Sequence, residues 1–133
     1  MPELSIDETS TLALLHNFFI ALLTGVGRAA RGEILSSSNY TTYFAVDHLL
    51  ELFRYYIPTD QPTLIDPLDS SRRCEVTHPE LAKALQVILR LPVSEQALRL
   101  LELADKQLRI CMSNYPQATV EIVRQKLAKQ LNS

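Results

Sequence analysis

The chain has 133 residues, and a folded domain of that size buries roughly two thirds of the surface that the unfolded chain exposes. Hydrophobic residues make up 47% and charged residues 21% of the sequence, which excludes the apolar-poor, highly charged composition of disordered chains. Thirteen basic and fifteen acidic side chains give a net charge of -2, and this balance disfavours binding to nucleic acid phosphates. We therefore expect residues 1–133 to form a single globular domain without a nucleic acid partner.

Cysteine usage and the N-terminal residues indicate a cytoplasmic protein. Cys74 and Cys111 are too few for a disulfide framework and lack the clustered spacing of a zinc site. The first residues lack the basic start of a signal peptide, and the apolar run Phe18–Leu23 is too short to span a bilayer. We expect a reducing compartment, no membrane insertion, and neither a metal nor a cofactor.

The first predicted helix covers about residues 7–31. Apolar residues recur at three- and four-residue steps from Leu12 to Val26, and Gly32 can take the left-handed conformation that ends many helices. The apolar stripe is wide enough to contact neighbours on more than one side, so this helix should be central. Because a monomeric bundle would leave part of that stripe uncovered, we also expect a homodimer.

A second helix follows from about Ser37 until Pro58 forbids its continuation. The segment from Pro58 to Thr77 is rich in proline, aspartate and serine, which predicts a long loop. Loops of this length inside compact domains are often functional.

Three shorter helices complete the prediction. Thr77 and Glu80 have the spacing of a capping box, which predicts a helix that begins there and ends at Pro92. Ser94 is the expected N-cap of a helix that runs to Cys111, and a last helix follows Pro116. The expected fold class is an all-α bundle of four to five helices.

Gly25, Gly27 and Ala30 match the glycine fingerprint of dinucleotide-binding folds, with Asp47 at about the distance of the ribose-binding acid. That fingerprint requires a preceding strand, whereas these glycines interrupt a helical apolar stripe. We favour the alternative, a glycine-permitted close contact between helices.

Asp47 and His48 lie beside apolar positions of the second predicted helix. One of them could reach the bundle interior and serve in acid–base chemistry or in substrate binding. The alternative is a hydrogen-bonded structural pair, because buried polar groups are nearly always satisfied by neighbours.

The densest polar cluster is the Asp66–Glu75 segment just before the third predicted helix. Its arginines can anchor the loop through carboxylate ion pairs or hold the polar groups of a ligand. We expect the loop to fold back on the bundle, held by Leu64, Ile65 and Leu68, and to line the principal cleft. The candidate binding residues of this segment are Asp66, Asp69, Arg72, Arg73 and Glu75.

Arg73 and His78 have the spacing of the R-x(4–6)-H motif and resemble HEPN ribonucleases. The resemblance implies a dimer that cleaves RNA without metal, or an inactive relative of such an enzyme. Cys74 stands where that family normally has a polar residue, and the acidic Asp69 and Glu75 would repel RNA.

A second resemblance rests on three motifs in order. They are R-G-E at Arg31–Glu33, R-R-x-E at Arg72–Glu75 and P-E-L-A from Pro79. Over about residues 17–131 the chain resembles the C-terminal helical domain of aminoglycoside- and lincosamide-type nucleotidyltransferases, which is similar in shape to HEPN domains. The resemblance implies a bundle that forms part of an acceptor-substrate pocket beside a nucleotidyltransferase domain.

The catalytic motif of those nucleotidyltransferases, a Gly-Ser element followed by paired aspartates, does not occur in these 133 residues. Nucleotidyl transfer needs such carboxylates to hold magnesium. We therefore expect a non-catalytic binding module that binds a small molecule or a partner protein, such as a separate nucleotidyltransferase catalytic subunit. The metal-independent HEPN-like ribonuclease is the alternative.

Overall fold

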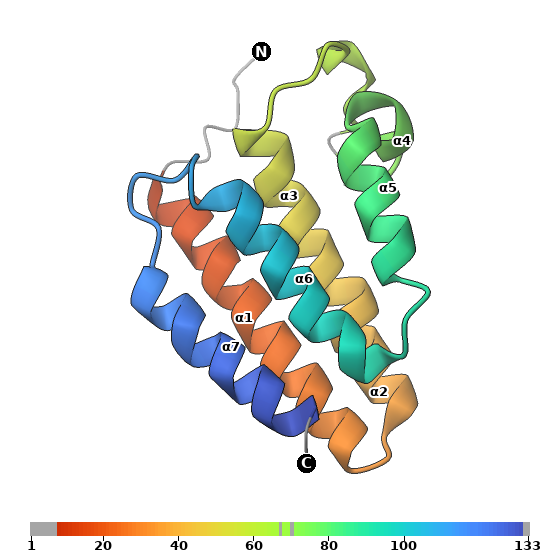
Figure 1. Ribbon diagram of the computed structural model, residues 1–133. Coiled ribbons are helices and arrows are strands. Elements are labelled where there is room, and N and C mark those ends of the chain that lie inside the picture. Colours follow the sequence, from red (N-terminus) through yellow and green to blue (C-terminus); the bar gives the residue numbers. More distant parts are fainter. Residues whose placement is uncertain (1–7, 67, 70, 132–133) are drawn as a thin grey trace.

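A computed structural model describes residues 8–66, 68–69 and 71–131. These residues form a helical bundle without strands, as the sequence predicts (Figure 1). The elements are the α-helices α1 (Glu8–Ala30), α2 (Ile34–Ser38), α3 (Val46–Tyr56), α4 (Cys74–Thr77), α5 (Pro79–Ile88), α6 (Val93–Leu108) and α7 (Gln117–Leu131), the π-helix η1 (Asn39–Ala45) and the 3₁₀-helix η2 (Pro62–Leu64).

The first helix, α1, is central, which confirms the prediction from its wide apolar stripe. It contacts α2, η1, α3, α6 and α7 (Figure 1). Leu15, Phe18 and Leu22 are buried in the core between these helices. By length and composition α1 could cross a membrane, but eight of its residues are buried inside the bundle. Ile20 is the large apolar side chain that α1 leaves most open, with 61% of its surface exposed, and Leu12, Leu14 and Leu23 are half-buried.

The end of α1 follows the prediction. Gly32 has a φ of 80°, and its N–H group donates to the Ala29 carbonyl at 2.9 Å. The next N–H group, from Glu33, donates to the Arg28 carbonyl at 2.9 Å. This pair of bonds satisfies carbonyls that the helix end would otherwise leave free. The predicted start at Asp7 lies outside the described residues.

The second predicted helix begins at Ile34 rather than Ser37, and it contains an unpredicted π-helical segment, η1. Gly25 of α1 lies against this segment so closely that a Cβ atom on Gly25 would be 1.9 Å from Thr41 Oγ1. Ser37 Oγ donates to the Gly25 carbonyl at 2.7 Å. Gly25 therefore permits a close helix contact, which is the alternative that we favoured over dinucleotide binding. Gly27 makes no such contact, because a Cβ there would meet nothing within 4 Å.

The predicted capping box at Thr77 is wrong. Thr77 is the last residue of α4, a short helix inside the segment that we expected to be a loop. The N-cap of α5 is His78, which makes no side-chain capping hydrogen bond, and Pro79 begins that helix. The Thr77 hydroxyl cannot cap α5 because it pairs with the His78 ring nitrogen Nδ1 at 3.0 Å.

The predicted N-cap at Ser94 is also wrong, because α6 begins one residue earlier, at Val93, after Pro92. A buried side chain, Gln96, connects the end of α5 to this helix. Its amide nitrogen donates to the carbonyl of Leu91 at 2.9 Å, and its oxygen accepts from Thr42 Oγ1 at 2.7 Å. The helix ends at Leu108, before the predicted Cys111.

Candidate functional site

The predicted loop site is organised around Asp66. Its Oδ2 accepts from Arg72 Nη1 at 2.9 Å, and its Oδ1 accepts from the backbone N–H groups of Leu68 and Asp69 at 2.8 and 3.1 Å. The Arg72 hydrogen bond, followed by the backbone donors, holds the pKa of Asp66 below its usual value. The expected ion pair between an arginine and a carboxylate of this segment is therefore confirmed, and it joins two ends of one loop.

The other candidate residues of the segment face solvent. Asp69 accepts from the Ser71 hydroxyl at 2.8 Å, which with the Ser71 backbone N–H lowers the pKa of Asp69. Arg73 has a φ of 63°, and its Nη1 donates to the Leu64 carbonyl at 3.5 Å. Glu75 is exposed on α4. The segment thus anchors itself through local turns.

Two of the three apolar residues expected to hold the loop do so in part. Leu64 and Ile65 are half-buried, whereas Leu68 is 96% exposed and holds nothing. Its backbone N–H group bonds to Asp66, so the turn directs the Leu68 side chain outward.

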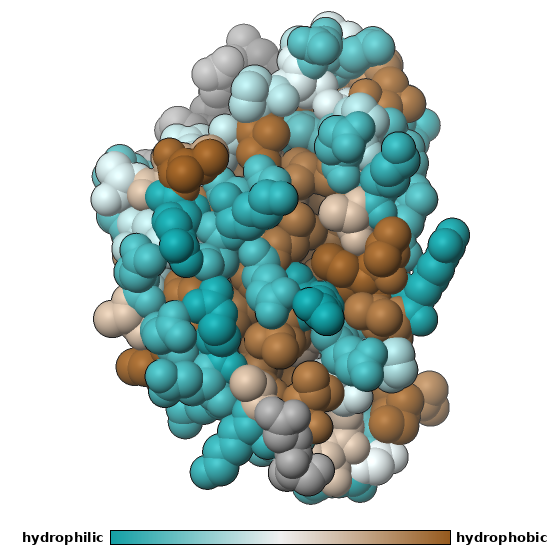
Figure 2. Space-filling model, viewed as in Figure 1, coloured by the Kyte–Doolittle hydropathy of each residue, from teal (hydrophilic) through white to brown (hydrophobic). Residues whose placement is uncertain are grey.

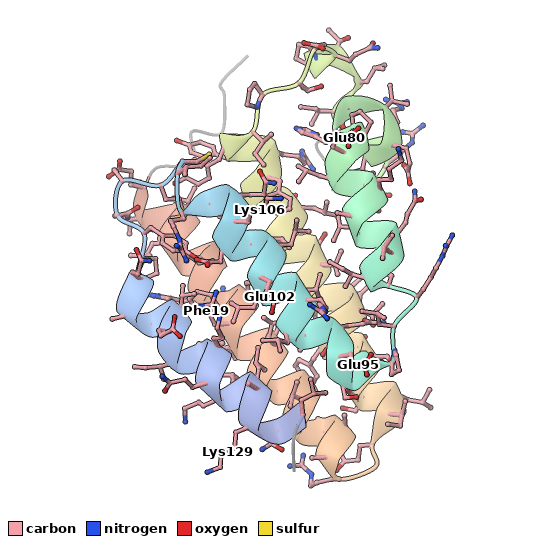
Figure 3. The ribbon with its side chains drawn as sticks, in the orientation of Figure 1. Phe19, Glu80, Glu95, Glu102, Lys106 and Lys129 are labelled. Atoms are coloured by element: carbon pink, nitrogen blue, oxygen red, sulfur yellow. The ribbon has the colours of Figure 1, made fainter. Side chains whose placement is uncertain are left out.

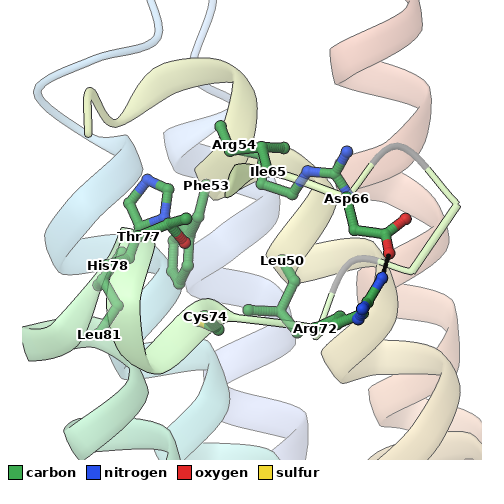
Figure 4. Close-up of a pocket in the computed structure, with 10 residues that line it drawn as sticks. All are labelled: Leu50, Phe53, Arg54, Ile65, Asp66, Arg72, Cys74, Thr77, His78 and Leu81. Carbon is green, nitrogen blue, oxygen red and sulfur yellow. Dashed lines mark hydrogen bonds and ion pairs between the residues drawn. The ribbon is translucent and has the colours of Figure 1, made fainter. Parts of the chain in front are cut away.

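Asp66 and Arg72 line a small cavity between the loop, α3 and α5 (Figure 4). Leu50, Phe53 and Leu81 form its apolar wall. Its volume is about 10 Å³, enough for about one water molecule and too small for a substrate. The expectation that this loop lines the principal cleft is therefore wrong, because larger hollows lie at the other end of the bundle.

His78 closes the inner side of the same cavity (Figure 4). Its Nε2 lies 2.9 Å from the Ile57 carbonyl oxygen, to which it donates a hydrogen bond, and its Nδ1 lies 3.0 Å from the Thr77 hydroxyl. Both ring nitrogens are engaged, and the side chain is buried. This geometry fixes the start of α5 to the end of α3 and gives His78 no free nitrogen for acid–base chemistry.

Cys74 is buried at the start of α4. Burial, followed by the neighbouring charge of Glu75, raises the pKa of its thiol. Because the thiolate is the reactive form, Cys74 is not an activated nucleophile.

The structure does not bring Asp47 and His48 to the loop site. Both are on α3, where Asp47 is exposed and half-buried His48 lies beside it. Neither residue lines the cavity beside Asp66 and Arg72. The seven predicted site residues therefore do not converge on one pocket.

The most buried charged group was missed by the sequence analysis. Asp105 on α6 accepts from Tyr115 Oη at 2.5 Å and from Arg124 Nη2 at 2.8 Å, and it forms an ion pair with Arg109. Burial alone would raise the pKa of Asp105, but these hydrogen bonds outweigh burial and lower it. An acid within the apolar stripe of α6 was the available sequence signal. The cluster joins α6 to α7 and faces no described cavity.

Two adjoining hollows lie at the C-terminal ends of α1 and α7, and one of them is also bordered by α2 and by the start of α6. We call them together the α1–α7 hollow. Their volumes are about 340 and 350 Å³, within the range of small-molecule sites. They share Val26 and Gln130. The remaining lining residues are Leu23, Ala29, Ala30, Ile34, Pro92, Val93, Ser94, Lys126, Leu127, Lys129 and Leu131.

A second feature is an exposed apolar surface on α2 and η1, which we call the α2–η1 surface. Its members are Leu35, Tyr40, Tyr43 and Phe44. Leu35 is 90% exposed and Tyr43 is 65% exposed, and the Tyr43 and Phe44 rings lie edge to face with centroids 5.4 Å apart. Apolar atoms gather over α2 at the lower right of Figure 2.

The α2–η1 surface differs from the apolar strip between α5 and α6, which is also visible in Figure 2. Charged side chains border that strip, including Glu95, Glu102 and Lys106 on α6 (Figure 3). Residues 34–46, by contrast, contain no charged side chain and no histidine. A charge-depleted, tyrosine-containing surface has the composition of an interface core.

No family model, curated protein or solved structure matches this chain. In the described part of the chain, no group of three or more His, Cys, Asp or Glu side chains is placed to hold a metal ion. The nucleotidyltransferase and HEPN resemblances therefore remain predictions from sequence motifs.

Proposed function

We propose that this chain is a non-catalytic binding module that works as a homodimer, with the α2–η1 surface as the contact between the two copies. The exposure of Leu35 and Tyr43 on an uncharged helical segment carries this proposal. Large contiguous apolar patches on a folded protein mark interaction sites.

A second copy of the chain suits this surface because residues 34–46 bring no like charges together. The neighbouring Arg28, which lies 5.4 Å from the centroid of the Tyr40 ring, forms an ion pair with Glu33 at 4.0 Å. In a two-fold symmetric contact the same patch lies on both sides and must complement itself. A shallow depression of about 690 Å³ lies between Leu35 and Tyr43 and could receive a side chain of the partner copy. Tyrosine and phenylalanine add large contact area at a low cost in conformational entropy.

A binding role is favoured over catalysis because the histidine and the buried cysteine near the loop are not available as a base or a nucleophile. His78 has both ring nitrogens engaged, and burial raises the pKa of Cys74. A nucleotidyltransferase subunit as an additional partner, as the motif resemblance implies, is a further part of this proposal, and we place the dimer in the cytoplasm.

The test is light scattering after gel filtration at micromolar concentrations, with Leu35→Glu and Tyr43→Glu as separate variants. We expect a dimer for the wild type and monomers for both variants, because each change buries a charge without a partner in the contact. Helical circular dichroism should remain unchanged in both variants.

The matched control is Ile110→Glu, since Ile110 is 83% exposed and follows α6, away from the α2–η1 surface. This variant should remain dimeric. A monomeric wild type, or equal dissociation by Ile110→Glu, would reject the homodimer.

A further inference from the structure

The α1–α7 hollow combines an apolar wall with a basic rim. Half-buried Leu23 and the exposed Ile34 and Leu131 form its apolar surface, with Val26 and Leu127 buried behind it, and Lys126 and Lys129 line the same hollow. Figure 3 shows Lys129 projecting from the C-terminal end of α7. Among the described residues, neither lysine has an ion pair with an acidic side chain.

We infer that this hollow binds an amphiphilic anion, a single molecule with an apolar chain and a carboxylate or similar acidic head. The chain would lie along Leu23, Ile34 and Leu131, and the head would pair with the two ammonium groups. Charge complementarity selects the acid over a neutral apolar molecule, because the lysines lack acidic partners within the described chain.

The same lysines have a simpler role that the test must separate from ligand binding. Lys129 is in the last turn of α7, where a cation stabilises the helix dipole. That role affects the stability of α7 and predicts no difference between charged and neutral ligands. A ligand-binding role predicts such a difference.

The experiment is calorimetric titration of the full chain with dodecanoate and, separately, with dodecanol, which has the same chain and no charge. We expect tighter binding of dodecanoate, and a roughly tenfold loss of its affinity in the Lys126→Gln/Lys129→Gln double variant, from two exposed ion pairs. The affinity for dodecanol should not change. Added salt should weaken the binding of dodecanoate alone.

Two further variants locate the site. Ala30→Trp should weaken both ligands because the indole would occupy the hollow that Ala30 lines. Lys83→Gln/Lys106→Gln, which removes exposed lysines of α5 and α6, should leave both affinities unchanged. Repeating the titration with Leu35→Glu separates this site from the proposed dimer, because that residue does not line the hollow.

The proposal would be overturned if dodecanoate did not bind, or if dodecanol bound as tightly as dodecanoate. It would also be overturned if the Lys83→Gln/Lys106→Gln variant lost as much affinity for dodecanoate as the Lys126→Gln/Lys129→Gln variant. Sedimentation with phosphatidylglycerol vesicles distinguishes a free amphiphile from a membrane surface. Binding to the vesicles without binding of monomeric dodecanoate would also overturn it.

Discussion

Asp105 is the residue at which burial and charge interact most strongly. Replacing it with asparagine removes the charge and presents an amide N–H₂ group to Arg124 and Arg109, which are donors themselves. We expect Asp105→Asn to lower the free energy of unfolding by about 1–3 kcal/mol, the usual cost of leaving buried polar groups unsatisfied. Urea unfolding measures this change.

The control for this change is Glu102→Gln on the same helix. Glu102 pairs with Arg99 at 3.2 Å, and both side chains are largely exposed. Exposed pairs contribute little, so we expect a change within about 0.5 kcal/mol. A comparable loss in both variants would show that the Asp105 cluster is no more important than a surface ion pair.

Sequence proximity explains why one polar cluster was predicted and the other was not. Arg72 and Asp66 lie in one loop, so their ion pair follows from local chain geometry. Asp105 and Arg124 are on different helices, and their contact depends on how α6 and α7 pack. The many charged residues of the loop make it easy to recognise in the sequence, whereas Asp105 is a single acid among the apolar positions of its helix.

At the scale of elements, α1 and η1 pack closely because Gly25 has no side chain at their contact. A Cβ atom on Gly25 would lie 1.9 Å from Thr41 Oγ1 and 3.2 Å from Thr41 Cβ. We expect Gly25→Ala to destabilise the fold by about 1–3 kcal/mol through overpacking. Thermal and urea unfolding measure this loss.

Gly27 provides the matched control, because it is in the same helix and has open space where a Cβ would be. Gly27→Ala should stabilise the protein by about 0.5–1 kcal/mol through its higher helix propensity. Combining Gly25→Ala with Thr41→Ala should recover part of the loss, because the clashing hydroxyl is removed. Equal effects of the two glycine substitutions would contradict the close contact.

For the whole molecule, the pKa shifts predict loss of stability at both extremes of pH. The pKa values of Asp66, Asp69 and Asp105 are lowered by folding. The unfolded carboxyls bind protons from about pH 4 downward while the folded ones do not, so the free energy of unfolding falls below about pH 4. The loss continues as the pH falls through the folded pKa values.

Tyr115 contributes a loss of stability at alkaline rather than acidic pH. Burial, followed by the hydrogen bond to Asp105, raises its pKa, so above about pH 10 only the unfolded state ionises and stability falls. Urea unfolding at acidic pH, from about pH 7 to pH 3, should show a smaller loss for Asp105→Asn than for the wild type. Urea unfolding above about pH 10 should show a smaller loss for Tyr115→Phe than for the wild type. Identical pH profiles for the variants and the wild type would show that these groups do not control it.

The sequence alone determined the helical class, the central position of α1 and its end at Gly32, because apolar periodicity and glycine geometry act over one or two helical turns. It also predicted that Arg72 or Arg73 pairs with a carboxylate of the same loop, and the structure shows that this pair is Arg72 with Asp66. Tertiary structure decided the π-helix opposite Gly25, the buried Asp105 cluster and the separation of Asp47 and His48 from the loop. These features depend on how the packed helices are rotated and spaced relative to one another. That packing is fixed by contacts between side chains that are far apart in the sequence.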